Sequence, residues 1–312
     1  MNIVFFGTPD FSVICLRKLL LSRHNISCVV TTPDKERGRG RNLSFTAVKS
    51  FAIKNNLSVL QPEKLNDETF IQQLRNLNAD LFIVVAFRIL PVSVFTIPKL
   101  GTFNLHGSLL PKYRGAAPIQ WALINGEPET GVTTFFLKDK VDTGNIILQE
   151  KIEIFSDDNF ELLHDRMAET GSDLILKTID FIEEGNVKVT EQTNSEATPA
   201  PKITHQISRI DWKKSAIEIH NLVRGLSPYP GAFILFKEKQ YKIYRTHTIK
   251  SKEEIGPILL LDSSVDKNGI KVYSSKKNIY FETGNGIIEI LEIQPEGRKR
   301  MSAEEFLRGY KF

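Results

Sequence analysis

Cysteine is scarce in this sequence. Only Cys15 and Cys28 occur among 312 residues, and both lie inside apolar segments. Two isolated cysteines in such surroundings argue against a disulfide framework and against a zinc site built from thiolates. Long hydrophobic runs are missing as well, because no stretch reaches the roughly 18 consecutive apolar residues that a membrane-spanning helix needs. Residues 1–6 lack the cationic flank and the cleavage site of a signal peptide. We therefore expect a cytoplasmic protein with no membrane partner.

Metal-binding and nucleotide-binding patterns are missing too. The six histidines are scattered, and they lack ligand-like spacing with cysteine or glutamate partners. The sequence also lacks the glycine-rich loop that holds nucleotide phosphates and the Gly-x-Ser-x-Gly turn of serine hydrolases. We expect no metal cofactor.

Positive charge is concentrated in the last third of the chain. Residues 1–200 carry 21 Lys and Arg against 24 Asp and Glu, and residues 201–312 carry 20 against 13. The net charges are therefore −3 and +7, which add to the formal +4 of the whole chain. A basic module on a slightly acidic body is typical of proteins that bind a polyanion. A well-solvated surface explains the charge alone equally well.

Strands and helices alternate through the first 189 residues. The apolar patterns predict strands at 2–6, 26–31, 80–87, 101–106, 132–137 and 146–154, with a short one near residue 59. Helices are predicted at 8–21, 47–55, 67–76, 118–124 and 159–183. This alternation predicts an α/β fold with a Rossmann-like, doubly wound and mostly parallel sheet.

A polar segment without apolar periodicity follows this region. Residues 190–203 are rich in small and polar residues and in proline, as linkers are. Beyond it, the patterns predict a helix at 215–226 and short strands at 232–236, 241–246, 258–261, 270–273, 278–282 and 287–293. Such strands predict a small β-barrel or a sandwich, and we expect an OB-like barrel. The expected domains are 1–189, a linker at 190–203, and 204–312.

The least ordinary residues follow the strand predicted at 101–106. Asn104 and His106 stand two apart in a strand and therefore project from the same face. Ligands collect beyond the carboxyl ends of strands in open parallel sheets. An amide and an imidazole at such an end can stabilise an oxyanion and move a proton. For these two residues alone, the better explanation is that they merely cap a strand end.

Asp142 lies in a turn-rich connection between two predicted strands. A carboxylate close to His106 would favour the protonated imidazole. The spacing along the chain cannot prove that closeness, and an Asp-Thr-Gly turn also fits an ordinary hairpin. The three residues together are therefore a hypothesis about one site.

Residues 104–120 resemble the signature of the folate-dependent formyltransferase superfamily. They read Asn-Leu-His-Gly-Ser-Leu-Leu-Pro-Lys-Tyr-Arg-Gly-Ala-Ala-Pro-Ile-Gln. Residues 141–144, Val-Asp-Thr-Gly, are similar to the second catalytic motif of that superfamily. Residues 6–11, 37–41, 210–212 and 226–232 resemble the branch that acts on methionyl-tRNA. Together the motifs cover essentially the whole chain in order.

The resemblance implies a reaction. The donor is 10-formyltetrahydrofolate, which leaves as tetrahydrofolate, and the acceptor is the α-amino group of methionine on initiator tRNA, for translation initiation. Asn104, His106 and Asp142 carry over as the catalytic residues of a direct transfer. In that mechanism Asn104 and protonated His106 stabilise the oxyanion, and Asp142 orients the imidazole and helps to relay protons. We expect the enzyme to be a monomer.

The resemblance also implies a folate site. The segment that carries over is Ser108, Leu109, Leu110 and Pro111, and the loop after residue 86 is expected to contact the pterin. In that loop Phe87 and Arg88 replace the usual Tyr-Gly, which removes access to a positive φ. We expect Arg88 to point to solvent rather than to bind the glutamate tail of the folate.

Arg37, Arg39 and Arg41 form a basic loop that glycines interrupt. Arginines suit contacts to phosphates and base edges, although a solvated loop also fits the residues alone. By the resemblance this loop enters the acceptor stem of the tRNA, with Arg39 at the key position. Broader contact is expected from the basic final third, at Lys213, Lys214, Arg224, Lys237, Lys239, Lys242, Arg245, Arg298, Lys299 and Arg300. We expect Trp212 and Tyr229 to pack in the seam between the two domains rather than to stack on bases.

Two other functions stay open at this point. A sugar or nucleotide formyltransferase would share the Asn-x-His and Asp-Thr-Gly chemistry, but it would not need the basic loop and the basic final third. A non-catalytic RNA-binding protein would explain the positive charge, but it would leave residues 104–120 and 141–144 without a role.

Overall fold

A computed structural model describes residues 1–37, 42–185, 187–236, 238–249, 262–265, 269 and 271–310. The chain divides into two compact units, which are described separately. The first unit comprises Met1–Pro118, Glu129–Glu153 and His164–Ala200. The second unit comprises Ile119–Pro128, Ile154–Leu163 and Pro201–Phe312. Among the described residues, no helix combines the length and the apolarity that crossing a membrane requires.

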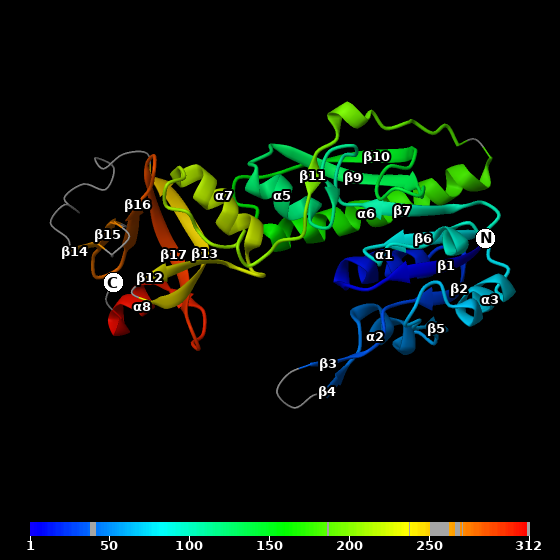
Figure 1. The fold of residues 1–312 in the computed structure, drawn as a ribbon, viewed down its shortest axis with the longest axis horizontal. Helices are drawn as coiled ribbons and strands as arrows, with labels where there is room; N and C mark the ends of the chain where they lie inside the picture. Colours follow the sequence, from blue (N-terminus) through cyan, green and yellow to red (C-terminus); the bar gives the residue numbers. More distant parts are fainter. Residues whose placement is uncertain are drawn as a thin grey trace. The chain divides into compact units, whose positions relative to one another are not determined.

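The first unit is built on a sheet of seven strands in the order β10-β9-β7-β6-β1-β2-β5 (Figure 1). Five of them run parallel to one another. At one edge, β9 pairs antiparallel with β7, and β10 pairs antiparallel with β9. The bounds are β1 (Asn2–Gly7), β2 (Asn25–Val30), β5 (Val59–Leu60), β6 (Leu81–Val85), β7 (Thr102–His106), β9 (Glu129–Phe136) and β10 (Ile146–Glu153). This arrangement confirms the prediction of a mostly parallel α/β sheet.

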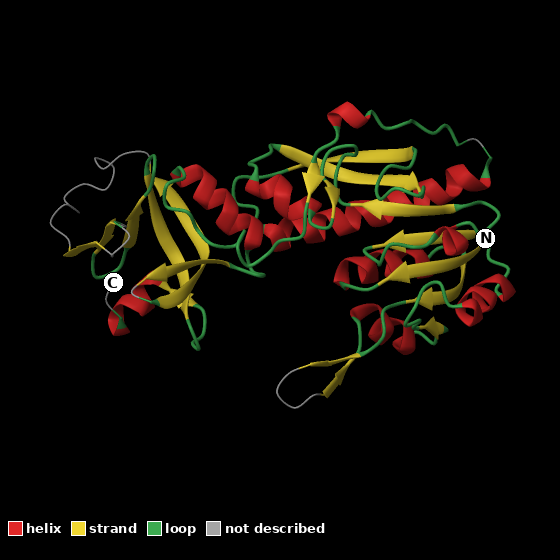
Figure 2. Ribbon diagram, in the orientation of Figure 1, coloured by secondary structure: helices red, strands yellow, loops and turns green. Residues whose placement is uncertain are grey.

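Helices cover both faces of this sheet (Figure 2). The helices of this region are α1 (Asp10–Leu20), α2 (Ala47–Lys54), α3 (Glu68–Asn76), α4 (Val92–Phe95) and α6 (Phe160–Glu183). On one face, α3 and α4 bury apolar side chains against β1, β2 and β6. On the other face, Leu105 of β7 packs so closely on α6 that a Cβ at Gly171 would lie 2.7 Å from it. The doubly wound arrangement predicted from the sequence is therefore present.

The register of the central strands defines the edge at which the site forms. Gly7, the last residue of β1, pairs with Val85 of β6, and Val85 pairs with Leu105 of β7. The carboxyl ends of three neighbouring parallel strands therefore lie in one row. The residues that follow them, including His106, share that edge, which is where open α/β sheets bind ligands.

Several short elements were not predicted. A hairpin of β3 (Lys35–Arg37) and β4 (Asn42–Ser44) follows β2. Beyond α6, the segment that we expected to be a linker contains the 3-10 helix η1 (Asn194–Glu196) and β11 (Pro199–Ala200). β11 pairs in parallel with β8 (Arg114–Gly115). Polar side chains of the segment also form hydrogen bonds within the first unit: Thr198 accepts from the N–H of Tyr113, and Gln192 accepts from Arg114.

The second unit contains a curled antiparallel sheet in the order β12-β13-β17-β16-β15-β14, with β18 beside β17. Its strands are β12 (Ala232–Phe236), β13 (Lys239–Ile249), β14 (Asp262–Val265), β15 (Lys271–Ser274), β16 (Ile279–Glu282), β17 (Ile287–Pro295) and β18 (Met301–Ser302). Its helices are α5 (Pro118–Ile124), of which Pro118 belongs to the first unit, α7 (Ala216–Leu226) and α8 (Ala303–Gly309). The strand predicted at 258–261 lies outside the described residues.

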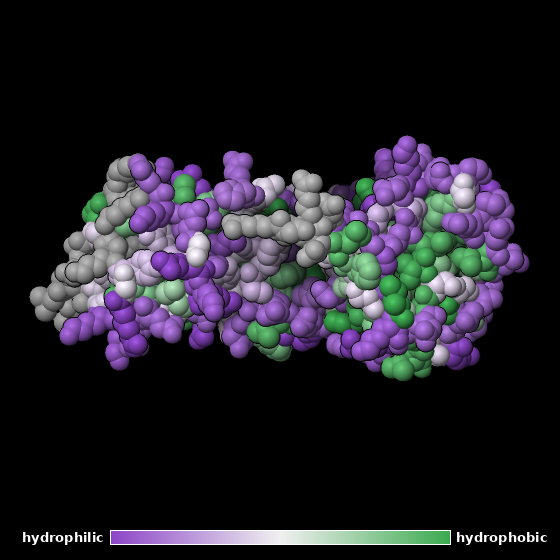
Figure 3. All heavy atoms as spheres, turned by 90° about the horizontal axis from the view of Figure 1, so that it is seen from below, coloured by the Kyte–Doolittle hydropathy of each residue, from purple (hydrophilic) through white to green (hydrophobic). Residues whose placement is uncertain are grey.

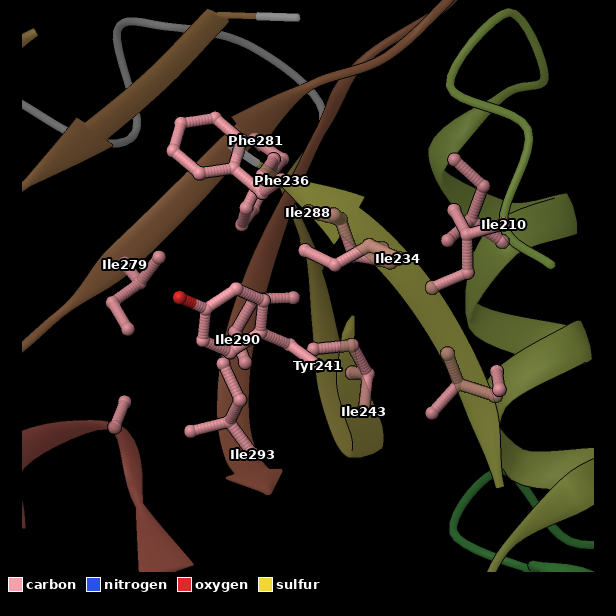
Figure 4. Packing of buried hydrophobic residues seen from close by; sticks show 14 of the residues in the cluster. Ile210, Ile234, Phe236, Tyr241, Ile243, Ile279, Phe281, Ile288, Ile290 and Ile293 are labelled. Carbon is pink, nitrogen blue, oxygen red and sulfur yellow. The ribbon is translucent and has the colours of Figure 1, made fainter. Parts of the chain in front are cut away.

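Apolar side chains from the concave side of this sheet form one core with α7 (Figure 4). Ile234, Ile243 and Ile290 project into it from β12, β13 and β17. Trp212 stacks on Phe281 at 4.3 Å between ring centroids, with an angle of 8° between the planes. Trp212 therefore packs, as predicted, but its partners belong to the core of the second unit rather than to a seam between domains.

One aromatic residue of the second unit departs from the prediction. Tyr229 is 77% exposed, so the expectation that it packs was wrong. It lies in a turn between α7 and β12 in which residues 228 and 230 are both proline.

In the first unit, Figure 3 looks onto the side that carries α2, β5 and α3, where apolar residues gather among polar ones.

Candidate active site

Asn104 and His106 lie on β7, between β6 and the antiparallel strand β9. Asn104 pairs with Val84 and Phe135, and His106 pairs with Thr133. Both side chains therefore point to the face of the sheet opposite Leu105. The Oδ1 atom of Asn104 is buried and has no hydrogen-bond partner among the described residues. A buried polar atom without a hydrogen bond destabilises the folded protein unless a ligand supplies the missing partner.

The imidazole of His106 is buried, with only 6% of the residue exposed. Its Nε2 lies 2.8 Å from the carbonyl oxygen of Tyr113. A carbonyl oxygen can only accept a hydrogen bond, so Nε2 carries a proton and donates it. Nδ1 faces the Oδ2 atom of Asp142 at 3.9 Å. That separation is too long for a hydrogen bond but short enough for an ion pair once the ring is protonated.

Asp142 reaches His106 from the connection between β9 and β10. Its backbone is left-handed, with φ of 56°, and the residue is 8% exposed. Oδ2 accepts a hydrogen bond of 2.9 Å from the backbone N–H of Gly115. Left-handed backbone is uncommon for residues other than glycine and persists only where the surroundings hold it. The fold therefore brings together three residues that the sequence could only list.

Gly144 closes the Asp142 loop where the chain passes β9. A Cβ at this position would lie 1.6 Å from the carbonyl oxygen of Phe136. Gly144→Ala must therefore move the loop, and we expect it to cost about 3 kcal/mol of stability. The thermal unfolding midpoint of the purified variant measures this loss. Gly309→Ala is the matched control, because a Cβ there meets nothing within 4 Å. Equal unfolding midpoints for the two variants would contradict the claim that the Asp142 loop requires glycine at position 144.

The segment expected to bind folate follows β7 directly. Ser108 and Leu110 are buried, whereas Leu109 and Pro111 are partly exposed. The hydroxyl of Thr133 donates to the carbonyl of Ser108 at 2.6 Å and accepts from the N–H of Leu110 at 3.1 Å. The backbone of this segment is thus fixed by β9 before any ligand binds.

Arg88 does not point to solvent as we expected. Its guanidinium donates to the backbone carbonyls of Pro62 at 2.7 Å and Glu63 at 3.0 Å. Burial lowers the pKa of this guanidinium. The positive φ in the loop falls on Ala86, at 47°, two residues before Arg88. The loop therefore does not need a glycine at position 88.

The basic hairpin is tied to the sheet at its base. Asp34 forms an ion pair with Lys49, and Gln61 donates to Asp34 at 2.9 Å. The hydrogen bond from Lys49 is the largest of the effects that lower the pKa of the Asp34 carboxyl. Arg37 is the last residue of β3, and Arg39 and Arg41 lie outside the described residues.

The expected basic contacts of the second unit fall into two groups. Lys214, Lys242, Arg224 and Arg300 are bound within the unit, for example Arg300 to Glu292 and Lys242 to the carbonyl of Pro230. Lys237 lies outside the described residues. Five exposed cations make no ion pair within the described part of the chain: Lys213, Lys239, Arg245, Arg298 and Lys299. Of the cations predicted from the sequence, these five are the ones available to a polyanion.

One group of side chains has the composition of a metal site. His24, Asp180 and Glu183 offer ligand atoms within 4.8 Å of one another. However, Arg23 binds Asp180 at 2.9 Å and Glu183 at 2.6 Å, so a guanidinium already neutralises both carboxylates. The group lies at the amino end of β2, opposite the edge that carries His106.

The geometry at the end of β7 suits acyl chemistry. Nε2 of His106 is occupied by Tyr113, so Nδ1 is the ring nitrogen left to serve a reacting group. An amide and a protonated imidazole beside a buried carboxylate can stabilise a developing oxyanion and transfer a proton. Gln192 and the carbonyl of Tyr113 also belong to this arrangement, although the sequence carries no pattern that marks them.

Two family models match this chain. The model described as formyl transferase matches residues 1–179, and the model described as formyl transferase, C-terminal domain, matches residues 202–311. The chain therefore belongs to the formyl transferase family. A methionyl-tRNA formyltransferase of Flavobacterium johnsoniae is 46% identical over 313 residues, which cover 100% of this chain and 97% of the relative. That of Bacteroides thetaiotaomicron is 43% identical over 320 residues, with 100% and 96% covered. Within the family, the chain is an enzyme of the methionyl-tRNA formyltransferase group.

Solved structures share the fold. WlaRD, a sugar 3N-formyl transferase, has a TM-score of 0.66 at 21% identity, with 96% of this chain and 99% of that chain covered. HypX from Aquifex aeolicus in complex with tetrahydrofolic acid has a TM-score of 0.65 at 18% identity, with 100% and 48% covered. At this identity the likeness concerns the fold alone.

Proposed function

We propose that this enzyme transfers the formyl group of 10-formyltetrahydrofolate to the α-amino group of methionine on initiator tRNA, for translation initiation. The observation that carries the proposal is the amide of Asn104, whose buried Oδ1 has no hydrogen-bond partner among the described residues, on the same strand as His106, which faces Asp142. The full-length similarity to methionyl-tRNA formyltransferases supports the choice of acceptor. The solved structure of HypX with tetrahydrofolic acid supports a folate donor for this fold.

In the proposed mechanism, the neutral amine attacks the formyl carbon directly. The carbonyl oxygen becomes an oxyanion, and the amide N–H of Asn104 and the protonated Nδ1 of His106 donate to it. Asp142 stabilises the imidazolium and helps to move the proton from the amine to the folate nitrogen that leaves. The half-buried Leu109 and Pro111 are proposed to contact the folate, together with the backbone of Ser108 and Leu110.

An acceptor comparison tests this function. Purified enzyme is supplied with 10-formyltetrahydrofolate and, in separate reactions, initiator Met-tRNA, free methionine, or a nucleotide-linked amino sugar. We expect formylation of Met-tRNA only, measured as labelled formyl groups recovered in each acceptor after it is separated from the folate by chromatography. Preferential formylation of the amino sugar would replace the proposed acceptor. No transfer to any amine would overturn the proposal.

Binding of the tRNA should depend steeply on salt. If the five predicted cations that make no ion pair among the described residues contact phosphates, the logarithm of affinity should fall against the logarithm of salt concentration with a slope of about −4. Replacing Lys213, Arg245 and Lys299 with alanine should reduce that slope by about 2 to 3. Fluorescence anisotropy with labelled tRNA measures both values.

Lys271→Ala is the matched control for this titration. Lys271 is an exposed lysine of the same unit, and it already pairs with Glu282. The slope of log affinity against log salt concentration for Lys271→Ala should equal that of the protein without substitutions. Salt-independent binding, or an equal change for Lys271→Ala and the triple variant, would contradict the role of these cations.

A further inference from the structure

Gln192 uses its carboxamide completely, although it lies outside helices and strands. The residue is 7% exposed. Its Nε2 donates to the carbonyls of Asp142 at 2.9 Å and Gly144 at 2.7 Å. Its Oε1 accepts from Arg114 twice, from Nε at 3.0 Å and from Nη2 at 2.7 Å. An amide offers two N–H donors and one oxygen with two lone pairs, so the carboxamide is saturated and its orientation is defined.

The two segments that Gln192 joins are the ones that face the two nitrogens of His106. Tyr113 supplies the carbonyl that accepts from Nε2, and Asp142 supplies the carboxylate opposite Nδ1. Arg114 directly follows Tyr113 and precedes Gly115, whose N–H binds Asp142. A displacement of Gln192 would therefore reach both partners of the imidazole.

Both partners also need to be held in place. Tyr113 has φ of 58° and Asp142 has φ of 56°, so each sits in left-handed backbone that residues with a Cβ disfavour. Such conformations are unfavourable and persist where neighbouring contacts define them. The hydrogen bonds of Gln192 to the Asp142 carbonyl and to the neighbour of Tyr113 are contacts of that kind.

We propose that Gln192 is a positioning residue for formyl transfer, which keeps Asp142 and the Tyr113 carbonyl in place around His106. This role rests on the proposed function of the site. Gln192 itself touches no reacting atom in this account. It acts through the two groups that define the position and the proton of the imidazole.

Gln192→Glu isolates this role from simple anchoring of the segment. A carboxylate keeps the size of the side chain and the bond to Arg114, but it has no N–H to give to the Asp142 and Gly144 carbonyls. We expect kcat for Met-tRNA formylation to fall about 10- to 100-fold, because displacements near 1 Å have effects of that size. The KM values for folate and tRNA should stay within about twofold of the unchanged enzyme, since neither substrate is proposed to contact this residue.

Asn194→Ala is the matched control. Asn194 lies in the same segment and accepts from Nη1 of Arg114 at 3.0 Å, but within the described part of the chain no hydrogen bond links it to the Asp142 loop. If the segment merely anchors the chain, the two variants should behave alike. If Gln192 positions the site, Asn194→Ala should keep both kcat and KM within about twofold.

A spectroscopic readout separates this proposal from the function of the site. The ring-nitrogen NMR shifts of His106, assigned by their loss in His106→Ala, should change in Gln192→Glu and stay constant in Asn194→Ala. Unchanged shifts together with an unchanged kcat in Gln192→Glu would overturn the positioning role while leaving the function intact. If the enzyme without any substitution formylates no amine, the proposed function is overturned, and the positioning role of Gln192 is overturned with it.

Discussion

Asn104→Ala should lower kcat for formyl transfer by about 10²- to 10³-fold, which corresponds to roughly 2.7 to 4 kcal/mol of lost transition-state stabilisation. The amide of Asn104 lies at the ligand-binding edge of the sheet, and its buried Oδ1 has no partner in the part of the chain that the structure describes. A side chain left incomplete in this way is available to a bound substrate. Because the oxyanion develops only during the reaction, KM should change much less than kcat.

Single-turnover formylation of Met-tRNA measures this loss without interference from product release. Asn104→Asp is the informative companion, because it keeps the size of the side chain and replaces the N–H donor by a charged oxygen. It should be at least as slow as the alanine variant. A rate within about threefold of the unchanged enzyme for either variant would remove Asn104 from the oxyanion site.

His106→Ala should lower kcat by a similar factor, about 10² to 10⁴, which is the usual range for a general acid or base. The change removes Nδ1, which faces Asp142 at 3.9 Å, and it removes Nε2, which donates to the carbonyl of Tyr113. Both contacts are lost because they belong to the same imidazole ring. Thermal unfolding of the variant, measured in parallel, separates loss of chemistry from loss of fold.

His247→Ala provides the matched control for this experiment. His247 also faces a carboxylate, Glu289, at 3.7 Å, but its side chain is 66% exposed. Its replacement should leave kcat within about twofold. A comparable loss of kcat in both histidine variants would mean that the effect is not specific to the site at the end of β7.

The centre of the first sheet could be predicted from the sequence because β1 and β6 are almost continuous apolar runs. Both strands are buried along nearly their whole length, which is typical of parallel strands covered on both faces. The hairpin of β3 and β4 could not be predicted, because strands of three residues carry no periodicity. Helix α8 was missed although a signal existed: Ser302 and Glu305 form a capping box, a pattern that can be read before an apolar run.

The site was predictable only in part. Asn104 and His106 share a strand, so the alternation of side chains places them together. The contact between His106 and Asp142 depends on a left-handed turn and on a hydrogen bond from Gly115, neither of which is local to either residue. Gln192 lies in a polar segment whose composition resembles a linker. Burial of a polar side chain through long-range contacts has no local signature, and this is why the sequence did not indicate its place.

The central claim is that the formyl group passes directly from the folate to the amine at this site. A rapid-quench experiment with formyl-labelled 10-formyltetrahydrofolate tests it, run once with initiator Met-tRNA and once without an acceptor. Direct transfer predicts that label leaves the folate and reaches Met-tRNA in a single phase, and that no label stays on the protein when the tRNA is omitted. Label bound covalently to the protein, formed at least as fast as product, would contradict direct transfer.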